Sequence, residues 1–152
     1  MALVPREPYP HAPLAGPLGA NAVRFVIEGE AASKANSRQL AHHEGRVRFV
    51  KSSAALIFEC NAALQIPASA RVMFPGPVRV SLWLYYRNNR RDLDESVVLD
   101  VLQARYSVGG KKRGQLVRRG VYENDRQVRE KHVYHGVDAK RPRVEVLVEA
   151  LP

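Results

Sequence analysis

The stretch VRVSLWLYY, residues 78–86, is the clearest strand signal in the chain. Apolar residues stand at every second position, which is the period of a strand with one buried face. The alternating apolar set is Val78, Val80, Leu82, Leu84 and Tyr86. A Pro-Gly-Pro break at 75–77 precedes the stretch, and the polar segment RNNRRDLD at 87–94 follows it. The pattern therefore predicts a strand that is bounded on both sides by irregular chain.

A helix is expected on each side of this strand in the sequence. Ser52 or Ser53 can cap a helix that runs toward Leu64 and ends before Pro67. Its apolar residues at helical spacing are Ala54, Ile57, Phe58 and Leu64. The second helix begins at Asp94 as its N-cap. Its expected buried face consists of Val97, Val98, Val101 and Leu102.

Four further stretches have the alternation of strands, at 23–28, 46–50, about 127–134 and 143–149. The polar stretch at 33–45 and the basic stretch at 105–120 are expected to be loops. Strands and helices in this order predict a single α+β domain with a mixed sheet of about five strands and two main helices. Residues 1–20 hold five of the ten prolines and predict a flexible N-terminal arm, so the domain itself spans 21–152.

Composition limits the classes of function. The chain has 152 residues, of which 45% are hydrophobic and 26% are charged, and its formal net charge is +9. This excess of cations favours a nucleic-acid partner, although a soluble basic protein without a polyanionic partner has the same composition. No apolar stretch is long enough for a membrane span, and no secretory signal is visible. The single cysteine, Cys60, excludes an intramolecular disulfide and fits a cytoplasmic location.

Carboxylates are concentrated in two short segments. Asp92 and Asp94 lie two residues apart after the strand at 78–86, so in extended chain they project to the same side. Such a pair is unfavourable without a cation between its members, and Mg²⁺ prefers carboxylate oxygens. The alternative is that Asp94 caps a helix and Asp92 is solvated. The second segment, Glu123 to Asp125, is either a partner of the first or an ordinary polar turn.

The stretch 105–120 contains six cations and no acidic residue. Lysine and arginine between several glycines suit close approach to a phosphate backbone, and the alternative is a solvated loop. It is not a nucleotide-binding P-loop, because Arg105 and Lys112 stand where that motif has glycine and a hydroxyl residue.

The combination of RDLDESVVLDVLQ at 91–103 and GVYENDRQV at 120–128 resembles the RusA family of Holliday junction resolvases. Asp92, Asp94 and Asp125 match the three catalytic aspartates of that family, and Asp100 matches the aspartate of its helix. The segment EGEAASKANSR at 28–38 and the closing strand RVEVLVEA are also similar. The resemblance covers about residues 23–150. Val98 stands where the family usually has a lysine, and Glu95 and Asn124 also depart from its pattern.

The resemblance implies a homodimeric, Mg²⁺-dependent endodeoxyribonuclease that cuts four-way junctions in DNA recombination and repair. It implies that Asp92, Asp94 and Asp125 are catalytic and bind the metal. The basic side chains expected to contact DNA are Lys34, Arg38, Arg90, Arg91, Lys111, Lys112, Arg113, Arg118, Arg119 and Arg126. The alternative is a non-catalytic nucleic-acid-binding protein with a degenerate nuclease site, in which the acidic residues are structural.

Overall fold

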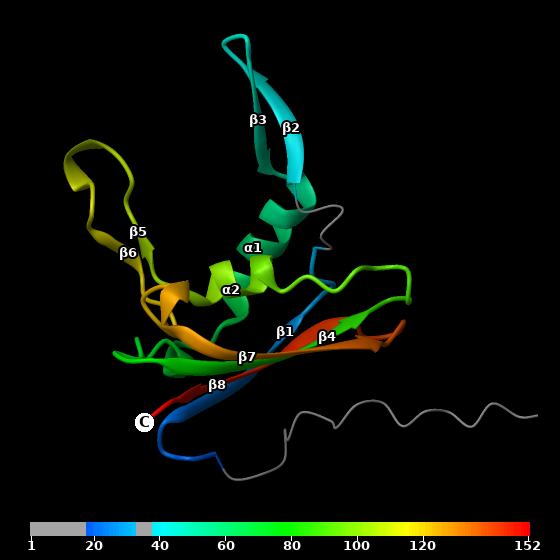
Figure 1. Cartoon of the computed structure of the whole chain (residues 1–152), viewed down its shortest axis with the longest axis vertical. Coiled ribbons are helices and arrows are strands. Elements are labelled where there is room, and N and C mark those ends of the chain that lie inside the picture. The colour runs from blue at the N-terminus through cyan, green and yellow to red at the C-terminus, as the bar shows by residue number, and fades with distance from the viewer. Residues whose placement is uncertain (1–17, 33–37) are drawn as a thin grey trace, which may run out of the picture.

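The computed structural model describes residues 18–32 and 38–152. In it, strand β4 (Val78–Tyr86) lies inside a four-stranded mixed sheet of the order β1-β8-β4-β7 (Figure 1). Its neighbours are β8 (Arg143–Ala150), which is antiparallel to it, and β7 (Val128–Val137), which is parallel. Strand β1 (Ala22–Glu28) pairs antiparallel with β8 at the other edge. The sheet and its two helices confirm the α+β class.

The alternating apolar set of β4 forms the centre of the core. All five of its residues are completely buried, and they pack with Val144, Val146 and Val148 of β8 and with both helices. The two helices lie on the same side of the sheet (Figure 1). The strand signal at 78–86 therefore predicts the element and its core-facing residues correctly, but Ser81 and Trp83 on the opposite face are buried as well.

Helix α1 (Ser53–Gln65) begins and ends where the sequence predicts, but it buries a different face. Ser52 is the N-cap, and its hydroxyl accepts a hydrogen bond from the Ala55 amide at 3.1 Å. The buried residues are Ala55, Phe58 and Ala62, so only Phe58 of the predicted face is correct. Ile57 and Leu64 are 62% and 87% exposed. Small alanine side chains face the core here because α1 packs directly against α2 and β1.

Helix α2 (Ser96–Leu102) buries the four residues predicted for it. It ends at Gln103, next to the segment that leads into β7. The hydroxyl of Tyr122, from that segment, donates to the Leu99 carbonyl at 2.9 Å. This hydrogen bond fixes the end of α2 against the chain that precedes β7.

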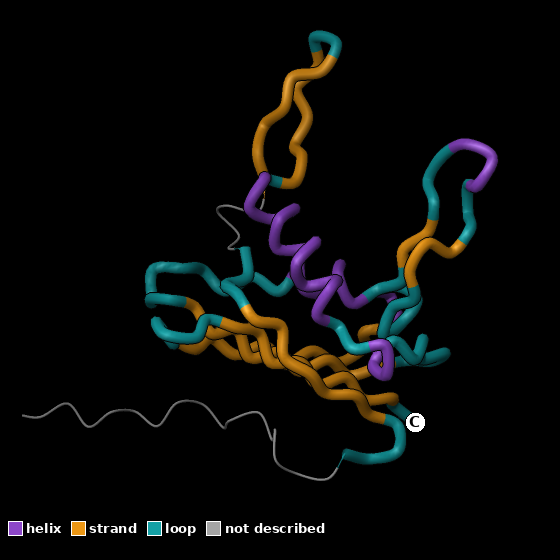
Figure 2. Tube along the Cα trace, turned by 180° about the vertical axis from the view of Figure 1, so that it is seen from behind, coloured by secondary structure: helices purple, strands orange, loops and turns teal. Residues whose placement is uncertain are grey.

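Two hairpins stand outside the sheet, on the side of the helices (Figure 2). The first pairs β2 (Arg38–His43) with β3 (Arg46–Lys51), so the expected loop at 33–45 is wrong for 38–43. The strand predicted at 46–50 is correct, but it belongs to this hairpin and the mixed sheet has four strands. Glu44 and Gly45 both have positive φ, 48° and 73°, as a two-residue turn that matches strand twist requires.

The second hairpin occupies the stretch expected to be a loop at 105–120. Its base is the pair β5 (Arg105–Tyr106) and β6 (Leu116–Arg118), and its tip is the 3₁₀ helix η3 (Gly110–Lys112). The remaining 3₁₀ helices are η2 (Ala68–Ala70) and η4 (Asp125–Gln127). The basic stretch is therefore an arm with a short paired base, and we call residues 105–118 the basic arm.

Most of the N-terminal arm expected at 1–20 falls outside the described residues, which begin at Leu18. In the described ranges, none of the helices has the length and apolar composition needed to cross a membrane.

Candidate functional site

Asp92 and Asp94 lie in the segment that leads from the end of β4 to the start of α2. Asp92 is exposed, whereas Asp94 is only 8% exposed. One carboxylate oxygen of Asp94 accepts two hydrogen bonds from Ser96, from the amide at 3.0 Å and from the hydroxyl at 2.7 Å. The Asp94 amide donates to the Tyr86 hydroxyl at 3.3 Å. Asp94 therefore secures the start of α2 to β4, but the N-cap of α2 is Glu95 and not Asp94 as predicted, because the helix begins one residue later, at Ser96.

Asp125 lies at the opposite end of α2. Its amide donates to the side-chain carbonyl of Gln103, the residue that ends α2, at 3.3 Å. Seven helical residues rise on the order of 10 Å, and this length separates Asp125 from Asp94. Within 18–32 and 38–152, no three His, Cys, Asp or Glu side chains form a group that could hold a metal ion. The expected convergence of Asp92, Asp94 and Asp125 is therefore absent, because parallel β4 and β7 keep the end of one strand far from the start of the other.

The residues around Asp125 build a rigid turn. Asn124 and Gln127 form a capping box around η4. The Asn124 side chain accepts a hydrogen bond from the backbone of η4, and the Gln127 side chain accepts one from the Asn124 amide. The side-chain amide of Gln127 also donates to the carbonyls of Phe74 and Gly76, at 2.6 and 2.8 Å. The Asn and Gln of the ENDRQV motif therefore have a structural role, which is to tie β7 to the segment before β4.

Charged residues of β7 and of the segments after β1 and β4 lie around the Asp94 end of α2. Lys131 of β7 pairs with Glu95 at 2.5 Å, and Arg91 pairs with Glu30 at 3.2 Å. The ring of His135 stacks on Tyr86 with centroids 5.1 Å apart. No motif in the sequence indicates these neighbours, because they come from separate elements and share no local pattern.

Burial is the main cause that raises the pKa of Tyr86 to about 12. The hydrogen bond from the Asp94 backbone opposes this rise, and the negative charges of Asp94, Glu30 and Glu95 add to it. The Tyr86 hydroxyl therefore stays protonated at neutral pH, and it holds the loop after β4 as a neutral hydrogen-bonding group.

Asp100, which matches the aspartate of the family's helix, is ion-paired. Lys51 of β3 bonds Asp100 at 2.9 Å and also pairs with Glu59 of α1. Burial lowers the pKa of Lys51, but its bonds to these two carboxylates outweigh burial and the pKa is raised. The triad joins both helices to the base of the β2–β3 hairpin.

The predicted DNA-contacting cations fall into three groups. Exposed side chains on the helix side or in loops belong to Arg38, Arg90, Lys111, Lys112, Arg113 and Arg126. Two others make protein contacts, Arg91 with Glu30 and Arg119 with the Arg71 carbonyl at 3.3 Å, and the half-buried Arg118 lines a pocket. Lys34 lies outside the described residues. Arg46 and Arg48 of β3 are exposed cations that were not among those predicted.

No model of a known protein family matches the sequence, and no curated protein matches it either. The local motifs and the geometry of their residues are therefore the basis for assigning a function.

Proposed function

We propose that this protein is a Mg²⁺-dependent, structure-specific endodeoxyribonuclease that acts on four-way DNA junctions in recombination and repair. The observation that carries the proposal is the position of the DLD motif at the start of α2, on the same side of the sheet as two cationic hairpins (Figure 1). In this proposal the protein acts in the cytoplasm as a homodimer, so that two active sites face two strands.

DNA binding is supported by the hairpins. The tip of the basic arm carries Lys111, Lys112 and Arg113, all exposed, and the β2–β3 hairpin carries exposed Arg46 and Arg48. Both project away from the sheet, with α1 and α2 at their bases (Figure 2). Cations on two arms can contact phosphates on two duplex segments, which suits a branched substrate.

Cleavage is supported by the resemblance of the acidic motifs, and the carboxylates fit a shared metal centre only in part. Asp92 and Asp94 come from one segment, and Mg²⁺ in phosphoryl chemistry is often held by one or two carboxylates together with substrate phosphates. Asp125 lies at the other end of α2 and does not form a three-carboxylate group with Asp92 and Asp94 among the described residues. Its place in the proposal depends on the resemblance alone.

Dimer formation is supported by uncovered apolar surface. Leu40 and Phe49 are cross-strand partners on one face of the β2–β3 hairpin and are 57% and 75% exposed. An isolated two-stranded hairpin is marginally stable, so this face gains from a partner surface. Size-exclusion chromatography with light scattering should give twice the chain mass, and Phe49→Ser should lower it toward one chain.

The second candidate is a DNA-binding protein without catalysis. It is favoured by the structural roles of the matched residues: Asp94 accepts hydrogen bonds from Ser96 at the start of α2, Asp100 pairs with Lys51, and Gln127 anchors the turn beside Asp125. Within the described residues, no hydrogen bond or ion pair holds the carboxylate of Asp92 or that of Asp125, whose amide alone bonds Gln103.

A junction-cleavage assay separates the two candidates. Purified protein is mixed with an end-labelled four-way junction, with Mg²⁺ or with EDTA, and binding is followed on the same samples by gel shift. The nuclease should cut only with Mg²⁺, and Asp92→Asn should bind but not cut. Glu130→Gln is the matched control, because it removes one negative charge on β7 where Glu130 pairs with Arg79. Binding without Mg²⁺-dependent cutting by the wild type would favour the second candidate.

A further inference from the structure

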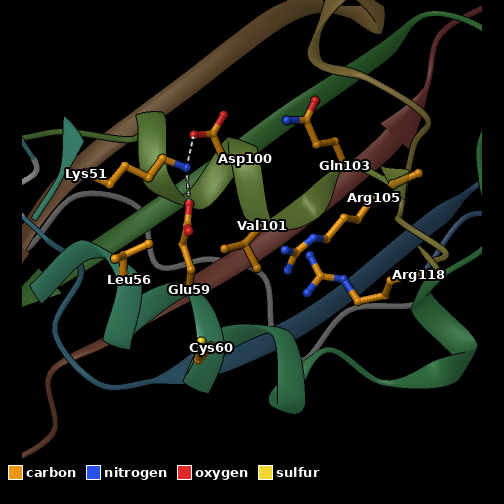
Figure 3. Close-up of a pocket in the computed structure, with 10 residues that line it drawn as sticks. Lys51, Leu56, Glu59, Cys60, Asp100, Val101, Gln103, Arg105 and Arg118 are labelled. Atoms are coloured by element: carbon orange, nitrogen blue, oxygen red, sulfur yellow. Dashed lines mark hydrogen bonds and ion pairs between the residues drawn. The ribbon is translucent and has the colours of Figure 1, made fainter. Parts of the chain in front are cut away.

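A pocket of about 480 Å³ lies between α1, α2 and the base of the basic arm (Figure 3). This volume is in the range of sites for small organic ligands. Its walls include apolar Leu56 and Val101, and charged side chains stand at its two ends. At one end the charged side chains form ion pairs with one another, and at the other end they do not.

The end nearest β3 is neutralised within the protein. Lys51 contacts Glu59 and Asp100, as Figure 3 shows, so one cation faces two carboxylates. This end offers carboxylate oxygens that can accept hydrogen bonds from a ligand, and it attracts no further anion.

The opposite end holds two arginines whose charges are not neutralised. Arg105 and Arg118 are direct cross-strand partners in the antiparallel β5–β6 pair, and like charges in this position repel each other. Their guanidinium groups point toward each other and into the pocket (Figure 3). Among the described residues, no carboxylate forms an ion pair with either.

Arg118 also has an unmet hydrogen bond. Its Nε atom is buried and has no hydrogen-bond partner within the described part of the chain. A buried donor without a partner costs about 1–3 kcal/mol, so such a group signals a missing partner.

A third cation makes this end more positive. Arg71 donates to the backbone carbonyls of Arg119 and Ala63, which carry no charge. The pKa of Arg71 is lowered mainly by burial and in addition by the positive charge of Arg118. Arg71 therefore lies close enough to Arg118 to feel its charge, and no acidic residue in 18–32 and 38–152 forms an ion pair with either.

We propose that this pocket binds a nucleotide, with Arg105 and Arg118 as the ligands of its phosphate group. Two guanidinium groups present paired N–H donors that match phosphate oxygens, and a phosphate between the terminal nitrogens of Arg105 and Arg118 offsets the repulsion of their charges. The sugar and base lie along Leu56 and Val101, with their donors toward Asp100. The nucleotide is either a free mononucleotide or one nucleotide of a single DNA strand. This site is separate from the DLD motif and does not depend on cleavage.

Isothermal titration calorimetry in EDTA tests the site without any nuclease activity. The probes are thymidine and deoxyadenosine 5′-monophosphates, the two nucleosides without phosphate, and a ten-nucleotide oligothymidylate. The variants are Arg105→Gln and Arg118→Gln, which lie on different strands of the arm. Arg129→Gln is the control, because it removes the same charge from an exposed position of β7 that has no part in the pocket or in the proposed DNA contacts. Circular dichroism establishes that each variant is folded.

At least one mononucleotide should bind, its nucleoside should not, and each pocket variant should weaken binding at least about tenfold. Arg129→Gln should leave the affinity unchanged. Competition by the oligothymidylate would identify a DNA strand as the source, and no competition would identify a free nucleotide. The proposal is overturned if neither mononucleotide binds, if the nucleosides bind equally well, or if Arg129→Gln weakens binding as much as the pocket variants.

Discussion

Replacing Asp94 with asparagine or with alanine should separate its structural role from a catalytic one. Asp94 uses one carboxylate oxygen as the acceptor for the Ser96 amide and hydroxyl, and it is almost buried. Asparagine keeps an acceptor oxygen in the same place but carries no charge. Alanine removes both the acceptor and the charge.

The size of the structural effect follows from these bonds. Removal of a side-chain acceptor at the start of a helix costs about 0.5–2 kcal/mol. Because two donors of Ser96 lose their partner, we expect Asp94→Ala to be near the upper end, about 1–2 kcal/mol. For a protein of this size each kcal/mol lowers the Tm by roughly 2–4 °C. Asp94→Asn should cost less than about 0.5 kcal/mol, since the acceptor remains.

The loss of cleavage activity in the two variants should not follow their loss of stability. If the Asp94 charge supports phosphodiester cleavage, both variants should lose activity by at least about a hundredfold, because charge stabilisation at such sites amounts to several kcal/mol. Thermal denaturation followed by circular dichroism measures the first effect, and cleavage of a four-way junction at a temperature well below the Tm of either variant measures the second. Wild-type cleavage by Asp94→Asn would refute a catalytic role, and equal decreases of Tm in both variants would refute the hydrogen-bond argument.

Three further predictions concern the arm, a glycine and a buried tyrosine. Neutralising the three cations at 111–113 should weaken the salt dependence of DNA binding. The slope of the logarithm of the DNA association constant against log salt, measured by fluorescence anisotropy, should decrease in magnitude by up to roughly 0.9 for each duplex phosphate that the arm no longer contacts. An unchanged slope would mean that the tip contacts no DNA. Gly120→Ala should destabilise the fold by about 3 kcal/mol in urea denaturation, because its Cβ would lie 2.3–2.5 Å from backbone atoms, whereas Gly109→Ala meets nothing within 4 Å and should be neutral. The pKa of Tyr86 is about 12 in the folded protein and about 10 in the unfolded chain, so the free energy of unfolding should fall as the pH rises between these values. Tyrosinate absorbance of the wild type and of Tyr86→Phe measures the folded value. A group that titrates near pH 10 in the folded wild type and is missing from the variant would contradict the prediction.

Local pattern predicts the elements of this fold well where one face is clearly apolar. The alternation of β4 and the valines of α2 identify the residues that face the core, although Ser81 and Trp83 on the other face of β4 are also buried. Helix α1 shows why the same method fails elsewhere, because Ala55 and Ala62 face the core and the larger Ile57 and Leu64 face solvent. Close packing between helices selects small residues, and hydrophobicity alone does not reveal this.

The candidate site is less predictable than the fold. The sequence places the start of α2 within one residue, and Asp94 bonds Ser96 there, although the N-cap itself is Glu95. The distance from Asp94 to Asp125 depends on the parallel pairing of β4 with β7 and on the direction of α2, which no short segment encodes. The pairing of Arg105 with Arg118 is also hidden, because the sequence of the basic arm suggests a loop and contains no strand alternation at its base.

The position of β8 has a consequence for how the protein is made. This strand lies between β1 and β4, and Ala22 pairs with Glu149 across almost the whole described chain. During synthesis β1 therefore has no partner until residues 143–150 have left the ribosome, and the sheet can close only after that point. Pairings so distant in sequence make folding slow. A stop codon just before Arg143 would remove the strand that joins the two halves of the sheet, so quality control should degrade the truncated product.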